Sequence, residues 1–400
     1  MRIGLFTDQY YPLISGVVTS IKMLYEGLTN LGHECFIFTS YDEKHIKDTE
    51  ELSNKNVINI RGRKYPFKGL KDYRYTFTHK RALKVVKKYN LDIIHIHTEY
   101  NMGKVAKKAS KKFNIPMVHT LHTLWADYLQ YLSPFFSKHF KRQMLFLLRK
   151  WFTGPVSKQS IIEIAPTEKA KIEGRVYGLS DDARIVPSGI ELEKFSSSKY
   201  SKEEIAKLRE SLDIKKNQFV FLYIGRISQE KKIPVLLRAY AKSLKDNDNA
   251  VFLIVGGGPE LDNLKRLSKE LEISNRVIFT DAVQWDKVGM YYQLGNIFVN
   301  ASQSETQGLT YIEALASSIP LLVQKDDCIS NVIQDYYNGI FFDGEDDLAL
   351  KMSEMLKATT TLKKIKANTL KSVEQYSKEN YAQAILSIYE EAIELHKNKK

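Results

Sequence analysis

The chain has 400 residues, which is too many for one ordinary hydrophobic core, so we expect two domains. Hydrophobic residues make up 43% and charged residues 27%, which excludes a disordered chain, and two distant cysteines exclude a disulfide framework and favour the reducing cytoplasm. No export signal is visible, and no apolar run approaches the roughly 20 residues that cross a bilayer, so we expect no membrane-spanning segment.

Positive charge is concentrated in the first half of the chain. The formal net charge is +13, and residues 1–190 hold 31 Lys and Arg residues against 17 Asp and Glu residues. Residues 55–112 alone hold 17 basic residues and three acidic ones. A region with this charge favours a negatively charged partner.

Short runs rich in β-branched and aromatic residues alternate with segments of helical period, which is typical of parallel βαβ units. In the first half the predicted strands are RIGLFT, ECFIFTS, NVINI, DIIHIH and PMVHTL. In the second half they are QFVFLYIG, AVFLIVG, RVIFTD, NIFVNAS and IPLLVQ. We therefore predict an α/β protein with two Rossmann-like, doubly wound parallel-sheet domains that face each other across a cleft.

Two basic segments of the first half have the period of amphipathic helices. In THKRALKVVKKYN we expect an apolar stripe to pack on the sheet, with these cations facing outward: Lys80, Arg81, Lys84, Lys87 and Lys88. In SKHFKRQMLFLLRKWF the apolar face looks wide enough to enter a membrane interface, and it comprises Phe140, Met144, Leu147, Leu148 and Trp151. The cations beside it are Lys138, Lys141, Arg142, Arg149 and Lys150.

We predict that this basic half binds an anionic membrane surface, where each Lys or Arg contributes roughly 1 kcal/mol. The predicted membrane contacts are Lys80, Arg81, Lys84, Lys87, Lys88, Lys141, Arg142 and Trp151. Plain solvated faces are one alternative. Nucleic acid is another, because aromatic residues that could stack on bases interleave with the charges: Tyr65, Phe67, Tyr73, Tyr75 and Phe77.

A domain boundary is indicated by IVPSGIELEKF, residues 185–195, which contains Pro and Gly and precedes a polar stretch. We place the first domain at 1–190 and the second at 191–375. Residues 376–400 have helical period, and we expect this segment to pack back on the first domain.

The second half contains two turns suited to anions. In FLYIGRISQEKKI a strand is followed by Arg226 and Lys231, a forked donor and a point charge that suit a diphosphate, although a solvated strand-exit loop would read the same. Three glycines at 256–258 follow the next strand and allow close backbone approach at a helix N-terminus, although a tight turn without a ligand explains them too.

A third motif, SETQGLTYIEALASS, places Glu305 and Gly308 in a strand-exit loop and Glu313 on the helix that follows. Gly308 lets the backbone approach a ligand, to which the helix amides would point. A carboxylate beside such amides suits a ligand rich in hydroxyl groups, such as a sugar. The alternative is an N-capping glutamate together with a glutamate on the helix face.

No metal site is expected. Asp246 and Asp248 precede a strand and so lie at the amino edge of the sheet, away from the ligand side, as a solvated turn would. His95 and His97 alternate along a strand without a ligand cluster, which favours roles in the core or in a cleft wall.

Taken in this order, Arg226 and Lys231, the glycines at 256–258, and Glu305 with Glu313 resemble the retaining nucleotide-sugar glycosyltransferases of the GT-B fold, family 4. The resemblance covers nearly the whole chain, because YYPLISGVVTSIKMLYEGLTNLGHE, DIIHIHTEY and VHTLHTLWADY are similar to that family's first loop, third-strand region and histidine motif. Within the family, SGVVTS, HTLHT and SETQGLTYIEALAS are most similar to the bacterial diacylglycerol glucosyltransferases.

The resemblance implies a role for each matching residue. Glu313 would hold the ribose hydroxyls and Glu305 the donor sugar, with Arg226 and Lys231 on the diphosphate. Gly16, at the start of a helix near Val17, would present amides to the diphosphate, and His122 would contact the donor sugar beside the acceptor. The implied catalytic residues are His122, Glu305, Arg226 and Lys231. The implied donor-binding residues are Gly16, Arg226, Lys231, Gly257, Gln307, Gly308, Leu309 and Glu313.

The chain departs from the family at two places. Where relatives often have Glu-Gly-Phe-Gly, this chain has Glu305-Thr306-Gln307-Gly308, and where they have Gly it has Lys232. The first change alters the wall beside the sugar, so the choice between glucose and galactose stays open.

The resemblance also implies the reaction: transfer of glucose from UDP-glucose to the 3-hydroxyl of 1,2-diacylglycerol, with retention, by a peripheral enzyme on the cytoplasmic face of the membrane. Its partners would be UDP-glucose, diacylglycerol and an anionic phospholipid surface, with no nucleic acid. No cofactor held by protein ligands is expected, and Mg²⁺ would act only as an activator. Alternatives are galactosyl transfer, addition of a second sugar to a glycosyldiacylglycerol, or a nucleic-acid- or membrane-binding protein with an inactive sugar site.

Overall fold

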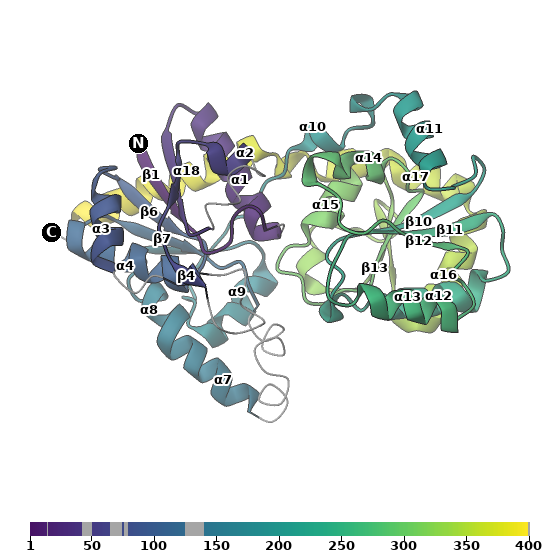
Figure 1. Cartoon of the computed structure of the whole chain (residues 1–400), viewed down its shortest axis with the longest axis horizontal. Coiled ribbons are helices and arrows are strands. Elements are labelled where there is room, and N and C mark those ends of the chain that lie inside the picture. Colours follow the sequence, from purple (N-terminus) through teal and green to yellow (C-terminus); the bar gives the residue numbers. More distant parts are fainter. Residues whose placement is uncertain (14, 42–49, 65–73, 76–78, 125–139, 399–400) are drawn as a thin grey trace. The chain divides into compact units, whose positions relative to one another are not determined.

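The structure is a computed structural model of the chain (Figure 1). It describes residues 1–13, 15–41, 50–64, 74–75, 79–124 and 140–398. The chain divides into two compact units. Unit 1 comprises Met1–Gly189 and Lys378–Lys400, and unit 2 comprises Ile190–Ser377.

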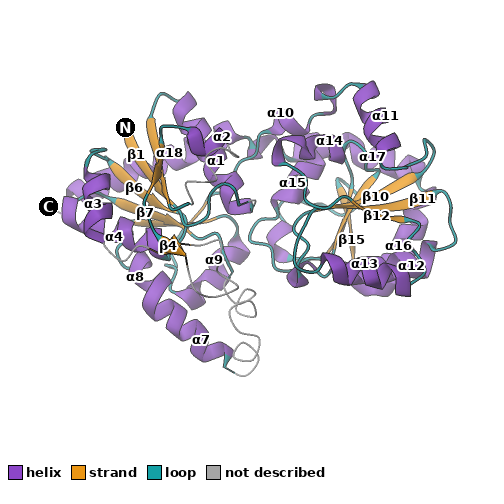
Figure 2. Ribbon diagram, in the orientation of Figure 1, coloured by secondary structure: helices purple, strands orange, loops and turns teal. Residues whose placement is uncertain are grey.

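Unit 1 is built on a parallel sheet with the strand order β3-β2-β1-β6-β7-β8-β9 among the described residues (Figure 2). Its strands are β1 (Arg2–Phe6), β2 (Glu34–Thr39), β3 (Val57–Asn59), β6 (Ile93–Ile96), β7 (Met117–Thr120), β8 (Ile162–Ala165) and β9 (Arg184–Ile185). A separate antiparallel pair is formed by β4 (Arg63–Lys64) and β5 (Arg74–Tyr75). The order reverses at β1, which is the doubly wound pattern.

Helices cover both faces of this sheet, with α3, α4 and α8 on one face and α1 and α18 on the other (Figure 1). They are α1 (Gly16–Asn30), α2 (Glu50–Ser53), α3 (His79–Lys87), α4 (Asn101–Phe113), α7 (Lys141–Leu148), η3 (Arg149–Thr153), α8 (Gly154–Ser157), α9 (Glu168–Gly174), η4 (Arg175–Tyr177) and α18 (Lys378–Asn398). Helix α18 comes from the end of the sequence but belongs to this unit, where it packs closely on α1. A Cβ on Gly27 of α1 would lie only 2.6 Å from the Ala382 Cβ, so this approach requires glycine.

Unit 2, which is described throughout, contains a parallel sheet with the order β12-β11-β10-β13-β14-β15. The strands are β10 (Phe219–Ile224), β11 (Ala250–Val255), β12 (Val277–Phe279), β13 (Ile297–Asn300), β14 (Leu321–Gln324) and β15 (Gly339–Phe342). The helices are α10 (Leu192–Phe195), α11 (Lys202–Ser211), α12 (Ile233–Leu244), α13 (Leu261–Glu270), α14 (Val288–Tyr292), α15 (Leu309–Ala316), α16 (Gly344–Lys357) and α17 (Thr359–Thr369). Short helical turns are η5 (Ser197–Lys199), η6 (Gln229–Lys231), η7 (Trp285–Lys287), η8 (Asp327–Ile329), η9 (Leu370–Ser372) and η10 (Glu374–Tyr376).

The predicted fold class is confirmed, because both units are Rossmann-like parallel sheets covered by helices. The buried strands carry the apolar runs read from the sequence, since strands covered on both faces by helices are apolar throughout. Strands β4, β5, β8, β9 and β15 were not predicted.

The first basic segment forms α3 as predicted. Ala82 and Val86 are buried in the core that Phe36 and Ile94 also line, and the cations of the helix are exposed. This arrangement follows from the helical period, which separates the two kinds of side chain.

The second basic segment differs from the prediction in which side chains face outward. Leu148 is 8% exposed and Met144 packs against the same cluster, which includes Leu121 and Tyr177, so neither belongs to an outward apolar face. Phe146 is 63% exposed instead. Met144 and Leu148 are four residues apart and so share one face of α7, whereas Phe146, midway between them, points to the other side. The face with Met144 and Leu148 is the one that packs on the protein.

Several predicted residues lie outside the part of the chain that the structure describes, namely Tyr65, Phe67, Tyr73, Phe77 and Lys138. Tyr75 lies in β5. Among the described helices, none combines the length and apolar character needed to cross a bilayer.

Candidate active site

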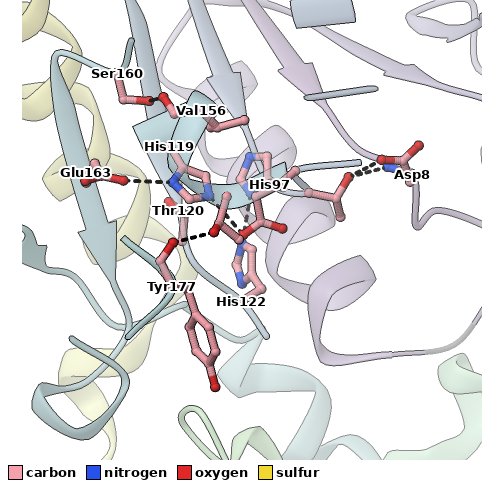
Figure 3. Close-up of polar contacts among 12 residues, drawn as sticks. Asp8, His97, His119, Thr120, His122, Val156, Ser160, Glu163 and Tyr177 are labelled. Carbon is pink, nitrogen blue, oxygen red and sulfur yellow. Dashed lines mark hydrogen bonds and ion pairs between the residues drawn. The ribbon is translucent and has the colours of Figure 1, made fainter. Parts of the chain in front are cut away.

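Three neighbouring strands of unit 1, β6, β7 and β8, carry a cluster of polar side chains at their carboxyl ends (Figure 3). His119 on β7 is in register with Glu163 on β8 and with Ile96 on β6. Residues in register on parallel strands point to the same face, so His119 and Glu163 lie side by side. Glu99 follows β6 and reaches the same histidine.

His119 lies between two carboxylates. Its Nδ1 is 3.2 Å from Glu163 Oε1 and its Nε2 is 3.2 Å from Glu99 Oε1. Burial opposes the charged form of the ring, but the hydrogen bonds to Glu163 and Glu99 outweigh it and raise the pKa of His119 to about 9. All three side chains are at most 4% exposed, and Glu163 also accepts a hydrogen bond from the Ser180 N–H.

His122, the predicted contact to the donor sugar, follows β7 and pairs with His97 after β6 (Figure 3). The distance between His97 Nδ1 and His122 Nε2 is 3.0 Å, and the two rings stack with their centroids 5.2 Å apart. Burial, and after it the charge on His119, lower the pKa of His122 to about 3. Burial and the neighbouring histidines also hold the pKa of His97 well below its usual value. Both rings are therefore neutral at physiological pH.

Two further contacts tie this cluster to distant parts of unit 1. His95 on β6 is 2.7 Å from the Tyr389 hydroxyl of α18 through Nδ1 and 2.7 Å from the Thr120 hydroxyl through Nε2. Asp8, after β1, accepts hydrogen bonds from the Thr98 hydroxyl and the Met102 N–H, and burial raises its pKa to about 7. These contacts fix the ends of β1 and β6 against α4 and α18.

In unit 2, two of the residues assigned to the donor contact each other. Lys231 Nζ, after β10, is 2.6 Å from Glu305 Oε1, after β13, and each side chain is about 15% exposed. Parallel strands β10 and β13 are neighbours, so their exit loops meet at one edge of the sheet. Arg226 precedes this pair in the same loop as Lys231 and is exposed.

The helix α15 begins immediately after Gly308 at the same edge. Gly308 has a φ of 73°, and a Cβ there would lie 2.2 Å from the Tyr311 ring, so only glycine fits. No side chain of the described residues caps the start of α15, and the helix dipole directs the N–H groups there, from Leu309 onward, toward an anion. Gln307 beside them is buried.

Glu313 lies in the second turn of α15 and is 7% exposed. Its Oε2 accepts a 2.8 Å hydrogen bond from the Tyr292 hydroxyl. Burial raises the pKa of Glu313 to about 7, against the opposing effects of Tyr292 and of the charge on Lys194. Lys194 is itself 3% exposed and stacks on the Trp285 ring.

The glycine turn at 256–258 approaches another loop of the protein. A Cβ on Gly256 would lie 2.0 Å from the Gly225 carbonyl oxygen, and one on Gly258 would lie 2.1 Å from the Ile227 carbonyl oxygen. Gly257 between them packs on Ala282. The turn therefore supports the loop that carries Arg226 and Lys231, which is a structural reason for the glycines.

The remaining predicted residues belong to unit 1. Gly16 is the first residue of α1, whose N-cap is Ser15. The predicted membrane contacts are all exposed: Lys80, Arg81, Lys84, Lys87, Lys88, Lys141, Arg142 and Trp151. Within the described ranges, no group of three histidine, cysteine or acidic side chains is placed to hold a metal ion. Asp248, at the amino edge of unit 2, forms an ion pair with Arg276.

Sequence reasoning missed Glu99, Glu163 and Lys194 as members of these clusters. Glu163 was the hardest to find because β8 was not predicted. The sequence feature that could have predicted β8 is the short run IIEIA, in which the charged Glu163 stands between apolar residues.

Two family descriptions match the chain. Residues 14–194 match "Glycosyltransferase Family 4" and residues 204–372 match "Glycosyl transferases group 1". Alpha-monoglucosyldiacylglycerol synthase of Acholeplasma laidlawii is 37% identical over 100% of this chain and 99% of its own length. The enzyme of the same name from Streptococcus pneumoniae is 36% identical over 98% of this chain and 86% of its own length.

Solved structures show the same fold at lower identity. Anabaena HepE in complex with UDP and glucose is similar with a TM-score of 0.76 and 18% identity, over 98% of this chain and 100% of that one. Sucrose-phosphate synthase from Thermosynechococcus elongatus has a TM-score of 0.75 and 20% identity, over 97% of this chain and 98% of that one.

Proposed function

Because the chain belongs to glycosyltransferase family 4, whose enzymes have the GT-B fold, we propose that it transfers glucose from UDP-glucose to the 3-hydroxyl of 1,2-diacylglycerol at a membrane surface. Full-length identity of 36–37% to two alpha-monoglucosyldiacylglycerol synthases supports this donor and acceptor. The product would be alpha-monoglucosyldiacylglycerol.

The observation that carries the donor assignment is the edge of unit 2 where Lys231, Glu305 and the start of α15 meet. When the bond between the sugar and the diphosphate breaks, negative charge develops on the leaving diphosphate. Lys231 and the amides after Gly308 are fixed in advance to stabilise that charge, and removing one such donor typically costs about 3 to 4 kcal/mol of transition-state stabilisation. Glu305 holds Lys231 in place and accepts hydrogen bonds from the sugar.

Retention follows from attack on the face that the diphosphate leaves. The C1–O bond to the diphosphate breaks while a bond forms between C1 and the acceptor oxygen on the same face. The acceptor proton moves to an oxygen of the leaving diphosphate, and the products are UDP and the glucosylated lipid. The sugar carries positive charge in this transition state, so a neutral His122 beside it is better suited than a charged one.

The surface of α7 and η3 supports membrane docking by unit 1. Large apolar side chains are exposed there, namely Phe140 (43%), Phe146 (63%), Leu147 (50%) and Trp151 (59%). Cations stand beside them: Lys141, Arg142, Arg149 and Lys150. Apolar side chains that enter the interface, surrounded by cations that face anionic headgroups, give reversible attachment. The turn η4, which packs against α7, adds the exposed Val176.

The test is incubation with radiolabelled UDP-glucose and vesicles that contain diacylglycerol and an anionic phospholipid, followed by extraction and chromatography of the lipid. We expect label in one new lipid, dependent on both lipid components. Labelled product only with UDP-galactose, or only with glucosyldiacylglycerol as acceptor, would replace the proposed substrates. No label in any lipid while UDP still binds would refute lipid glycosylation.

A pair of variants tests the membrane surface. Replacing Phe146 and Trp151 by Ser should reduce sedimentation with anionic vesicles and reduce lipid glucosylation. The matched control is Leu350→Ser, because Leu350 is 58% exposed on α16 of unit 2. Equal vesicle binding by both variants would move the membrane contact away from α7.

A further inference from the structure

We propose that Glu99, His119 and Glu163 form a proton-dependent clamp that positions His122 for sugar transfer. In this clamp the two carboxylates hold His119 as an imidazolium, and the imidazolium on β7 joins the exit of β6 to β8. The inference rests on the proposed function for its catalytic consequence, but its proton arrangement stands on the geometry of unit 1 alone.

The geometry requires two protons on His119. A neutral imidazole has one N–H donor and one bare nitrogen, whereas an ionised carboxylate is an acceptor only. Both ring nitrogens of His119 are 3.2 Å from a carboxylate oxygen. With a neutral ring, one of these contacts would place a nitrogen lone pair against a carboxylate oxygen.

Burial of Glu99, His119 and Glu163 costs more free energy than apolar side chains in the same place would, so packing alone does not explain these residues. His119 is 1% exposed and each carboxylate side chain is 4% exposed, so three ionisable groups have lost nearly all contact with water. Well-packed apolar side chains of similar volume are often as stable as such a buried ionic group. The cluster is stable only while every member keeps its partner, and this is what makes it sensitive to one proton.

His122 is three residues beyond His119 and lies just after the end of β7. It is held from the other side by His97, which follows β6 and has no partner for its buried Nε2 among the described residues. Loss of the His119 proton would turn a bare ring nitrogen toward Oε1 of Glu99 or of Glu163, and that buried carboxylate oxygen would lose its donor. The exits of β6 and β7 would then separate, and the His97–His122 contact would change with them.

Other titratable groups face this cluster from the neighbouring elements. They are His97 after β6, His122 after β7 and Asp8 after β1. His95 is in register with Val118, so it lies with Tyr389 of α18 on the opposite face of the sheet from His119. His95 and His97 are neutral, and Tyr389 is protonated, over the range in which His119 would titrate. The carboxyl of Asp8 titrates at lower pH, so His119 is the group of this cluster that changes charge near pH 9.

The first experiment follows the histidine rings by NMR in the full chain labelled with ¹⁵N-histidine, with His119 assigned from the signal lost in His119→Gln. We expect the His119 ring to carry two protons at neutral pH and to lose one near pH 9. Glu163→Gln should lower this midpoint by at least about one pH unit, since an opposite charge at this distance raises a histidine pKa by roughly one to three units. Glu163→Asp, which keeps the charge, and Glu168→Gln, an exposed control on α9, should keep the midpoint high.

The same spectra report on positioning without any activity. The His122 ring signal should shift with the His119 midpoint in the wild type and move with it in Glu163→Gln. Any of three results would overturn the clamp. They are a His119 ring with one proton at neutral pH, a His119 midpoint that Glu163→Gln does not change, and a His122 signal that does not shift as His119 titrates. If Glu163→Gln does not fold, the wild-type spectra alone still show whether His119 carries two protons at neutral pH and whether the His122 signal shifts as His119 titrates.

The second experiment measures kcat for lipid glucosylation against pH. The wild-type rate should fall only as pH rises toward about 9, and in Glu163→Gln this fall should begin at the lowered His119 midpoint. A rate reduced by the same factor at every pH would mean a purely structural role and would overturn the positioning role. Failure of all forms to glucosylate lipid would refute the proposed function instead, and the NMR result would still decide the clamp.

Discussion

Glu313 should make the affinity for the sugar donor depend on pH. The carboxyl is buried in unit 2, and burial raises its pKa to about 7 although the Tyr292 hydroxyl and the Lys194 charge oppose that rise. In the proposed site an ionised Glu313 accepts hydrogen bonds from two ribose hydroxyls, whereas the protonated carboxyl has less capacity to accept them. The donor therefore binds the ionised form, and affinity should fall as pH drops through about 7.

The size of the effect follows from that pKa. With a midpoint near 7, the ionised fraction of Glu313 is about 0.9 at pH 8 and about 0.1 at pH 6. The affinity should therefore fall about tenfold between these two values, which corresponds to about 1.4 kcal/mol.

Titration calorimetry with UDP-glucose is the assay of choice, because its diphosphate is esterified at both ends and carries no proton that titrates in this range. Glu313→Gln should bind more weakly and lose the pH dependence. Glu203→Gln, an exposed glutamate in the first turn of α11, should keep the wild-type dependence. A wild-type affinity that is constant across this range, or a slope that persists in Glu313→Gln, would show that Glu313 does not titrate beside the ligand.

Three further changes probe the two sites through stability. Gly308→Ala puts a Cβ 2.2 Å from the Tyr311 ring at a φ of 73°, so it should lower the free energy of unfolding by about 1–3 kcal/mol and abolish donor binding. Lys232→Gly removes a side chain at a φ of 51° and should raise the free energy of unfolding by up to about 1 kcal/mol. Tyr389→Phe removes the hydroxyl 2.7 Å from His95 Nδ1 and should cost about 1–3 kcal/mol. Urea unfolding measures all three.

Matched controls separate these causes. Gly344→Ala has a φ of 78° but open space around the new Cβ, so it should cost less than Gly308→Ala. Lys242→Gly, inside α12, should destabilise by about 1 kcal/mol. Tyr336→Phe, at a tyrosine that is 52% exposed, should have little effect. The argument on Gly308 would be contradicted if Gly308→Ala and Gly344→Ala lowered the free energy of unfolding equally. The other two arguments would be contradicted if Lys232→Gly lowered that free energy, or if Tyr389→Phe left it unchanged.

The sheets could be predicted from the sequence because their central strands are continuous apolar runs, as in β10 and β11. Strand β8 escaped prediction because Glu163 interrupts it, and a charge in a buried strand makes sense only beside His119 on the next strand. That pairing joins residues far apart in sequence, and periodicity cannot reveal it.

The outward face of α7 could not be predicted for a different reason. A helical period shows which side chains share a face, as Met144 and Leu148 do, but it does not show which face packs on the protein. In the structure Leu148 is buried with Met144 packed beside it, and Phe146 is exposed. In unit 2, the exit-loop residues Lys231 and Glu305 were recognisable, but the buried Lys194 beside Glu313 was not, because it comes from α10, more than a hundred residues earlier.

The two ends of unit 2 meet, and this makes the unit a cassette within the chain. The Ile190 N–H donates to the Tyr376 carbonyl oxygen at 2.8 Å, and Ser188 and Tyr381 of unit 1 both contact the Ser20 hydroxyl. A short linker could therefore join Gly189 to Lys378, and residues 190–377 could be expressed alone or exchanged for the corresponding part of a relative. The last helix of the sequence would have to stay with the first half, because truncating the chain after unit 2 would remove part of unit 1.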